Sequence, residues 1–345
     1  YTVTRIADEE IGFSLFVSAR RDDALVSSSI VLGEGTGAEG TTVDLRSWPG
    51  DDEWSDFVSR QLDEGLATLV AAIGRPWPED DGFVIREAYT PYLYGYAGWY
   101  RGEDAEIEIG EDLDAETVLH ELSHAWFNDA WFADRWITEG LAQEYSNSVL
   151  ESLGAEFTEP DDVPLDDEWA IALEDWGAPD FVNGADGYED FGYAASFRVI
   201  DLIVDEVGDE AMRDVFAAAD TGAITYVGDT PPEEVAPLRD WREFLDLLEI
   251  IGGSTSAESL FTEWALTPTQ IATLEPRGTA REAYAALDRR GGDWAPPFVV
   301  RVSMSHWNFG AASDQTEAAH AALDARAALE EVTVPLGLQL PSAAE

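Results

Sequence analysis

Residues 114–126 read Asp-Ala-Glu-Thr-Val-Leu-His-Glu-Leu-Ser-His-Ala-Trp. Asp114 is a favourable N-cap residue, and Glu116 places a negative charge in the first turn, where the helix dipole favours it. Neither Pro nor Gly interrupts the stretch, and Val118 and Leu122 belong to an apolar stripe at helical spacing. The pattern therefore predicts a helix with one buried face.

His120, Glu121 and His124 form a His-Glu-x-x-His motif on this helix. Residues four apart lie on the same face of a helix, so the two imidazoles can hold one zinc ion between them. Glu121 then lies beside the open side of the metal. The chain has only four His, so two of them at this spacing with Glu inserted make a chance match improbable.

Catalytic zinc normally has three protein ligands and a water, so a third ligand is expected. One frequent pattern places a His six residues after the second His, but the downstream positions here are Phe127 and Ala130. The other places a Glu on the next helix. Glu139 meets that requirement, with fourteen residues between it and His124.

These two segments resemble the gluzincin metallopeptidases. The motif at His120–His124 is followed by Trp-Ile-Thr-Glu-Gly-Leu-Ala at residues 136–142, which is similar to the Trp-Leu-x-Glu-Gly-Phe-Ala segment of the M1 aminopeptidase-like branch. The resemblance is specific over Ala105–Tyr145 and extends to about Gly208. It implies a zinc metallopeptidase with one Zn²⁺ per chain.

In such an enzyme His120, His124 and Glu139 bind the zinc, and Glu121 is the general base. Zinc lowers the pKa of a bound water towards about 7 and polarises the scissile carbonyl. Glu121 takes the proton of the water and delivers it to the leaving amine. The expected substrate is a peptide or a protein.

The resemblance also implies that a Tyr donates a hydrogen bond to the oxyanion. Tyr193-Ala-Ala-Ser-Phe resembles the segment that carries this Tyr in M1 enzymes, so Tyr193 is the first candidate and Tyr188 the second. Loss of one such donor typically costs about 10²–10³ in rate. Gln143, one turn after Glu139, could orient a ligand, but an exposed helical Gln is the simpler interpretation.

The predicted fold class is α+β: a zincin-like catalytic domain with a small mixed sheet, an active-site helix, a helical subdomain and a helical C-terminal extension. Residues 1–113 are expected to be β-rich with a backing helix, residues 114–251 to hold the active-site helix and helical subdomain, and residues 252–345 to form the extension. Strands are predicted at Gly12–Val17, Ala24–Leu32, Phe83–Tyr89 and Ala105–Gly110. Helices are predicted at Asp52–Ile73, Thr138–Leu153, Tyr188–Val207, Asp209–Ala219, Val235–Ile251, Glu258–Leu266, Ala280–Leu287 and Thr316–Leu329.

The strand at Ala105–Gly110 alternates as a half-buried strand does. Its place before the active-site helix favours an edge strand on which zincins bind an extended substrate by backbone pairing, and an ordinary sheet strand is the alternative. The preceding segment Gly95–Gly102 departs from the Gly-x-Met-Glu-Asn strand with which M1 aminopeptidases bind a free amino terminus.

Two alternative functions remain open from the sequence. One is an aminopeptidase with a different amine anchor, for which Glu103, Asp104 or Glu106 are candidates. The other is a cell-surface scaffold that keeps the zinc site but has lost catalysis, which the intact Glu121 argues against. His306 and His320 have no partner at ligand spacing and are interpreted as structural or surface residues.

The charge of the chain is extreme, with 71 acidic and 19 basic residues, a net charge of −52, and no Lys. A nucleic-acid partner and an anionic membrane surface are disfavoured, because both would be repelled. A solvated acidic surface, as in proteins that work in high salt, is the simplest explanation. A GC-rich genome would also replace Lys by Arg.

The sequence contains no Cys, so disulfides and thiolate metal sites are excluded. No apolar run approaches the length of about 20 residues that a membrane span requires, so no direct membrane insertion is expected. The chain begins at Tyr1 without Met. We therefore expect a processed protein that is extracellular or attached to the cell surface.

Overall fold

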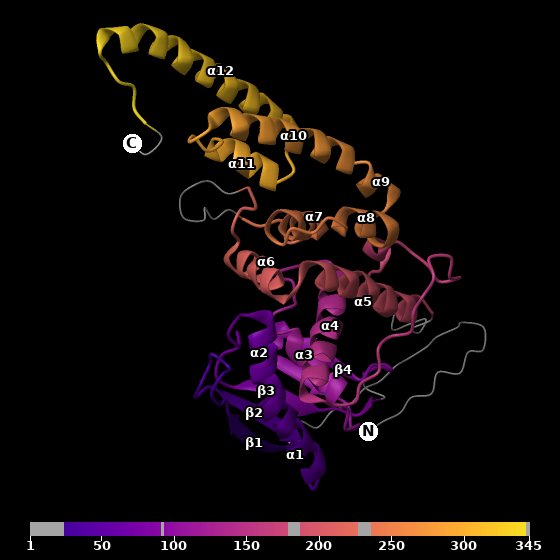
Figure 1. Ribbon diagram of the computed structural model, residues 1–345. Helices are drawn as coiled ribbons and strands as arrows, with labels where there is room; N and C mark the ends of the chain where they lie inside the picture. The colour runs from indigo at the N-terminus through magenta and orange to yellow at the C-terminus, as the bar shows by residue number, and fades with distance from the viewer. Residues whose placement is uncertain (1–23, 91–92, 179–186, 227–235, 343–345) are drawn as a thin grey trace, which may run out of the picture.

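The computed structural model describes residues 24–90, 93–178, 187–226 and 236–342. These residues form an α+β fold in which a small mixed sheet comes first and helices follow it (Figure 1). This confirms the expected α+β class, with a small mixed sheet and a helical C-terminal extension. The strand predicted at Gly12–Val17 lies outside the described residues.

The sheet has five strands in the order β1-β2-β3-β5-β4. The β2–β3 and β3–β5 pairs are parallel, whereas β1–β2 and β4–β5 are antiparallel. The strands are β1 Val26–Val31, β2 Thr42–Ser47, β3 Phe83–Glu87, β4 Gly98–Arg101 and β5 Glu106–Ile109. The strands predicted at Ala24–Leu32, Phe83–Tyr89 and Ala105–Gly110 correspond to β1, β3 and β5, whereas β4 was not predicted.

The prediction that Ala105–Gly110 is a half-buried edge strand is wrong. β5 lies inside the sheet between β3 and β4, and all four of its residues are buried. The edge is instead β4, because Gly98–Arg101 folds back antiparallel to β5 with Gly98 opposite Ile109. Alternating Glu side chains in β5 are buried because Arg86 on β3 contacts Glu106 and Glu108.

One face of the sheet is covered by a helix predicted at Asp52–Ile73, which the structure divides into α1 Asp52–Gln61, a π-helical turn at Leu62–Leu66 and α2 Ala67–Ile73. Its apolar side chains are buried in the main core with those of the strands. Gly65 permits close packing against the motif helix, since a Cβ there would lie 2.5 Å from Leu119 Cδ2.

The helical subdomain begins with α3 Ala115–Ser123 and α4 Arg135–Leu153. α4 packs against α3 and against α5 Gly187–Val207. Helix α6 Asp209–Thr221 then packs against α2. α4 begins three residues earlier than predicted.

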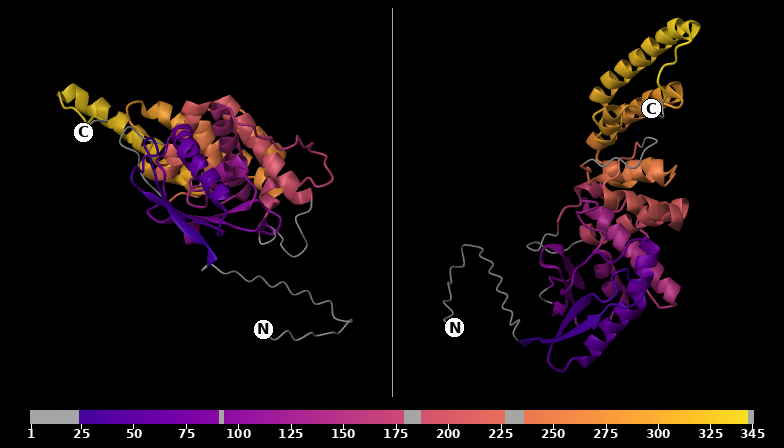
Figure 2. Two further views of the ribbon diagram at one scale, coloured as in Figure 1. Left: turned by 90° about the horizontal axis from the view of Figure 1, so that it is seen from below. Right: turned by 90° about the vertical axis from the view of Figure 1, so that its left-hand side faces the viewer.

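The C-terminal part consists of helices that extend away from the sheet (Figures 1 and 2). The helix predicted at Val235–Ile251 begins later, at Trp241, and the helix at Phe298–Ser305 was not predicted. The two long helices extend beyond their predicted bounds. The α-helices are α7 Trp241–Asp246, α8 Ala257–Leu260, α9 Pro268–Ile271, α10 Leu274–Gly291, α11 Phe298–Ser305 and α12 Phe309–Thr333. Short π-helical turns follow α7 at Leu247–Ile251 and α8 at Phe261–Ala265.

A buried ion network joins α10 to α7, to α8 and to the π-helical turn at Leu247–Ile251. The Arg277 and Asp246 side chains are each 1% exposed, and Arg277 Nη2 lies 2.6 Å from Asp246 Oδ1. Arg277 also contacts Glu249 and Glu258, at 2.8 Å each. Beyond this network α10, α11 and α12 bury a small second core, whereas residues up to Leu274 contribute to the main core. The boundary between the helical subdomain and the C-terminal extension at residue 252 stays a prediction.

Among the described residues, none of the helices has the length and apolar character needed to cross a membrane.

We expect Glu144 on α4 to make the stability of the fold depend on pH. Burial, together with Asp201 and Asp205, raises the pKa of Glu144 from 4.5 to about 7. A carboxyl whose pKa is raised in the folded state stabilises the fold while it is protonated, and this contribution is lost as pH rises from about 4.5 to about 7.

We therefore expect Glu144→Gln to gain stability relative to wild type as pH rises from 5 to 7.5, by on the order of 1 kcal/mol. Urea unfolding at the two pH values in constant high salt measures the difference. A difference that does not change with pH would contradict the assignment.

Candidate metal centre

The motif helix is fixed at its start by the predicted N-cap. The Asp114 carboxylate accepts hydrogen bonds from the backbone N–H groups of Glu116 and Thr117, both at 3.2 Å. The helix ends at Ser123, but His124 keeps helical backbone angles as its C-cap residue. His120 and His124 therefore share a face, as the spacing predicts.

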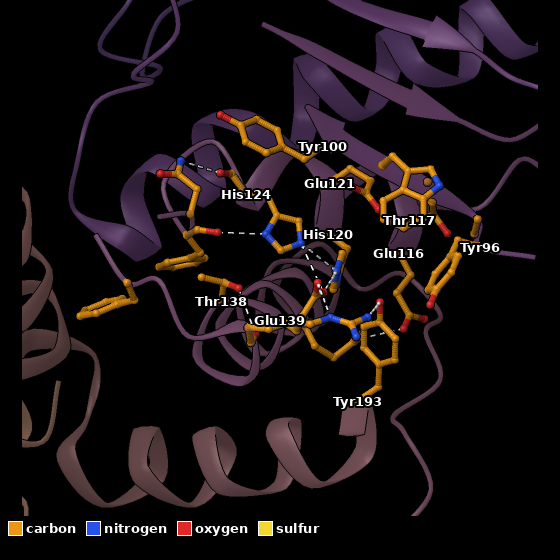
Figure 3. A pocket seen from close by; sticks show the side chains of 18 of the residues that line it. Tyr96, Tyr100, Glu116, Thr117, His120, Glu121, His124, Thr138, Glu139 and Tyr193 are labelled. Carbon is orange, nitrogen blue, oxygen red and sulfur yellow. Dashed lines mark hydrogen bonds and ion pairs between the residues drawn. The ribbon is translucent and has the colours of Figure 1, made fainter. Parts of the chain in front are cut away.

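Three ligand atoms converge on one point between α3 and α4 (Figure 3). His120 Nε2 lies 3.2 Å from Glu139 Oε2 and 3.2 Å from His124 Nε2, and His124 Nε2 lies 3.4 Å from Glu139 Oε2. Two ligands of tetrahedral zinc, each at about 2.0–2.1 Å from the metal, lie about 3.3 Å apart. The three predicted ligands thus have the chemistry and the separations that a zinc ion requires.

A backbone contact sets the orientation of His124. Its Nδ1 lies 3.0 Å from the carbonyl oxygen of Phe127, which can only accept a hydrogen bond. Nδ1 therefore carries a proton, and Nε2 is the nitrogen available to a metal. A hydrogen bond from the second ring nitrogen is the usual way in which proteins orient a metal-binding His.

The electrostatics of the cluster favour a cation. Burial lowers the pKa of His124, but the Glu139 carboxylate outweighs it and raises this pKa to about 9. Burial raises the pKa of Glu139, but His124 and His120 outweigh it and hold this pKa below its ordinary value. The negative charge of Glu139 attracts a proton to the His124 imidazole. It attracts a metal ion in the same way, and the metal ion competes with the proton for the same lone pair.

Glu121 lies beside the three ligands without belonging to them. It is 8% exposed, and burial raises its pKa, although His120 and His124 partly oppose this shift. Its side chain lies against Gly98 on the edge strand β4. The carboxylate is therefore held between the ligand cluster and the edge of the sheet.

Gly98 is required by this packing. A Cβ at position 98 would lie 2.6 Å from Glu121 Cγ and 2.8 Å from Glu121 Oε1, so the carboxylate would have to move. For the peptide hydrolysis that the sequence predicts, we expect Gly98→Ala to lower kcat about 10- to 100-fold, since a displacement of about 1 Å can cost 10²-fold. Zinc per chain should not change.

Gly33→Ala is the matched control for this substitution, because a Cβ at position 33 meets no atom within 4 Å. Peptide hydrolysis and bound zinc are measured for both variants. Wild-type kcat in Gly98→Ala would show that the Glu121 position is unimportant.

A cavity of about 570 Å³ opens above the ligand cluster. It is bounded by β4, by the motif helix, by the first turns of α4 and by Tyr193 from α5 (Figure 3). The structure thus brings His120, Glu121, His124, Glu139 and Tyr193 to one pocket.

The second Tyr candidate is not part of the pocket. Tyr188 is 47% exposed, and its ring packs edge-on against Trp169 at 4.9 Å. Gln143 does line the pocket and is half-buried, which corrects the interpretation as an exposed side chain. Its amide donates to Glu116 Oε1 and Asn147 Oδ1.

The acidic residues proposed as amine anchors also lie outside the pocket lining. Asp104 is exposed and contacts Arg101, and Glu103 is exposed beside it. Glu106 is buried within the sheet against Arg86. None of the three therefore contributes to the lining of the cavity, so the structure gives no support to them as amine anchors.

The two remaining His have local structural contacts, as expected. His306 Nε2 lies 2.8 Å from the carbonyl oxygen of Ala236, and His320 Nδ1 lies 3.0 Å from Arg290 Nη1. Among the residues that the structure describes, the only group of three possible metal ligands is the one at His120, His124 and Glu139.

Arg135 is a pocket residue that the sequence analysis did not single out. It is the first residue of α4 and lines the cavity together with Glu139, one turn later. The available signal was its position four residues before Glu139 on the same helix face. Starting the helix at Thr138 concealed that relationship.

No protein-family model matches this chain, and no curated protein matches it. Among solved structures the chain is similar to the M1 zinc metallopeptidase from Deinococcus radiodurans, at 14% identity and a TM-score of 0.41. It is also similar to a mutant of that enzyme, at 15% identity and a TM-score of 0.42. The same mutant bound to a Tyr-Ser-Ala substrate is similar at 18% identity and a TM-score of 0.41. Each comparison covers 71% of this chain and 53% of the other, so the chain spans about half the length of those structures.

Proposed function

We propose that this protein is a zinc-dependent metallopeptidase of the gluzincin type, with His120, His124 and Glu139 as ligands and Glu121 as general base. The observation that carries the proposal is the convergence of three ligand atoms, 3.2–3.4 Å apart, next to a separate buried carboxylate in an open cavity. A structural zinc site would be closed by a fourth protein ligand. Here Glu121 and a cavity of about 570 Å³ occupy that side.

A zinc ion bound there would supply a water of lowered pKa and a Lewis acid for the substrate carbonyl. Glu121 receives the proton of the attacking water and transfers it to the leaving nitrogen. The Tyr193 hydroxyl donates a hydrogen bond to the developing oxyanion.

The edge strand β4 gives this pocket a means to orient a peptide. β4 is the last strand of the sheet that the structure describes, and it borders the cavity at Gly98, Trp99 and Tyr100. An extended peptide can add to such an edge through backbone hydrogen bonds, which require no particular side chain. This supports hydrolysis of peptide bonds over hydrolysis of a small ester or amide.

Two measurements test the proposal. The first is metal per chain by mass spectrometry on protein purified in high salt, for which we expect one zinc. The second is cleavage of a peptide library in free and N-acetylated forms, together with binding of a hydroxamate inhibitor. Cleavage of both forms supports an endopeptidase.

The other outcomes separate the alternatives. Cleavage of free peptides alone would indicate an aminopeptidase with an anchor other than Glu103, Asp104 or Glu106. A protein that binds zinc but neither cleaves peptides nor binds hydroxamate would be the inactive scaffold. Absence of zinc after reconstitution would refute the metallopeptidase proposal.

A further inference from the structure

Arg135 connects the metal ligand Glu139 to the candidate oxyanion donor Tyr193. Its side chain is 15% exposed and its guanidinium lies over the Trp176 ring, 3.9 Å from the centroid. Nη1 donates to the carbonyl oxygen of Gly177 at 2.9 Å. Stacking and this hydrogen bond fix the plane of the guanidinium, so its remaining donors have defined directions.

Glu189 on α5 is the counter-ion of Arg135. Nη1 donates to Oε1 at 3.0 Å and Nη2 donates to Oε2 at 2.7 Å, which is a bidentate pair. The same carboxylate accepts from Trp176 Nε1 at 3.2 Å and from the Tyr96 hydroxyl at 2.8 Å. Four donors therefore hold Glu189, and Glu189 in turn holds Arg135.

The guanidinium also approaches the metal ligand. Nε lies 3.8 Å from Glu139 Oε1, while Glu139 Oε2 faces the two His side chains. Arg135 thus attracts the oxygen that does not face them. This interaction opposes rotation of the carboxylate and keeps Oε2 turned toward His120 and His124.

Nη2 of Arg135 donates to the Tyr193 hydroxyl at 3.2 Å. A guanidinium has no acceptor, so the Tyr193 oxygen accepts this bond and its own proton points elsewhere. The Tyr96 hydroxyl differs, because a carboxylate accepts its proton. Of these two tyrosines in the pocket lining, Tyr193 is therefore the one that can donate to a substrate.

We propose that Arg135, held by Glu189, is a positioning residue that orients the Tyr193 hydroxyl toward the substrate oxyanion and the Glu139 carboxylate toward the metal. The role of Arg135 in orienting Tyr193 rests on the proposed peptidase function. Its role in orienting Glu139 rests only on metal binding. Loss of a group that orients a metal ligand typically costs about 10- to 100-fold in metal affinity or activity.

The main test compares Arg135→Met, which keeps the apolar stem over Trp176, with Arg135→Lys, which keeps the charge but loses the planar fork. For Arg135→Met we expect about tenfold weaker zinc binding by chelator competition. We also expect kcat about 10- to 100-fold lower, with KM within about threefold. Arg135→Lys should recover part of the zinc affinity but not the full kcat.

A double-mutant cycle with Tyr193→Phe tests whether Arg135 acts through the tyrosine. Tyr193→Phe should lower kcat and leave zinc affinity unchanged. In the double variant, kcat should fall by a smaller factor than the product of the two single-variant factors. The reason is that the second substitution removes an interaction that is already lost. Losses that multiply fully would overturn this part of the proposal.

Arg277→Met is the control for a merely structural effect, since Arg277 is a buried arginine in a carboxylate network outside the pocket lining. It should lower the melting temperature without changing zinc affinity. A folded Arg135→Met protein with wild-type zinc affinity and kcat would overturn the proposal. If Arg135→Met does not fold, Glu189→Gln decides, because wild-type values in that variant would equally overturn it.

The design separates the two proposals. If the wild-type protein binds zinc but cleaves no peptide, the proposed function fails. The effect of Arg135→Met on zinc affinity then still decides whether Arg135 orients Glu139.

Discussion

Replacing His124 by alanine should remove stoichiometric zinc from the protein. His124 Nε2 is one of three ligand atoms within 3.4 Å of one another, and its Nδ1 contact with Phe127 fixes it in the metal-binding orientation. Without it, two ligands remain, and catalytic zinc normally requires three from the protein. Zinc affinity should fall by more than about 100-fold, because the loss of a group that only orients a ligand already costs about 10- to 100-fold.

The measurement is zinc per chain by mass spectrometry after dialysis against a weak chelator. His320→Ala is the matched control, because it removes the same side chain from an exterior contact with Arg290. Glu139→Gln should resemble His124→Ala, since the amide has no charge with which to attract the metal. Retention of one tightly bound zinc in His124→Ala would show that the metal binds elsewhere.

The candidate metal centre could be predicted from the sequence because the geometry of its three residues is local. A helix fixes the relation of His120 to His124, and one short loop separates that helix from Glu139. The N-cap at Asp114 and the absence of Gly and Pro supported the helix itself. Such short-range patterns determine residue placement without knowledge of the rest of the fold.

The order of the strands could not be predicted in the same way. Gly98–Arg101 was not recognised as a strand because its Gly and Tyr residues lack a clear alternation, and only pairing with β5 makes it the sheet edge. The Glu residues of β5 suggested a half-exposed strand. They are buried because Arg86, twenty residues before Glu106, lies beside them. Pairings of this kind are set by tertiary context.

Arg135 was missed for a related reason. Its partner Glu189 lies 54 residues away on another helix, and its stacking on Trp176 depends on a loop. A sequence pattern shows only that Arg135 precedes Glu139 by one turn. The close approach of Gly98 to Glu121 is likewise a contact between segments that no local spacing reveals.

Replacing Glu121 by glutamine should nearly abolish peptide hydrolysis while leaving zinc bound. Glu121 is not one of the three converging ligands, so zinc per chain should equal that of wild type. The amide cannot accept and return a proton, and general acid–base catalysis contributes about 10²–10⁴ in rate. We therefore expect kcat to fall by about that factor, with KM within a few-fold because glutamine keeps the shape of the side chain.

Glu144→Gln is the matched control, since Glu144 is also a partly buried carboxyl but lies outside the lining of the cavity. It should retain wild-type kcat at the same zinc content. A zinc-loaded Glu121→Gln protein that keeps wild-type kcat would rule out Glu121 as the base. Loss of zinc together with activity would instead assign Glu121 to metal binding. The pair of variants thus distinguishes a residue that moves protons from one that holds the metal, which activity alone does not.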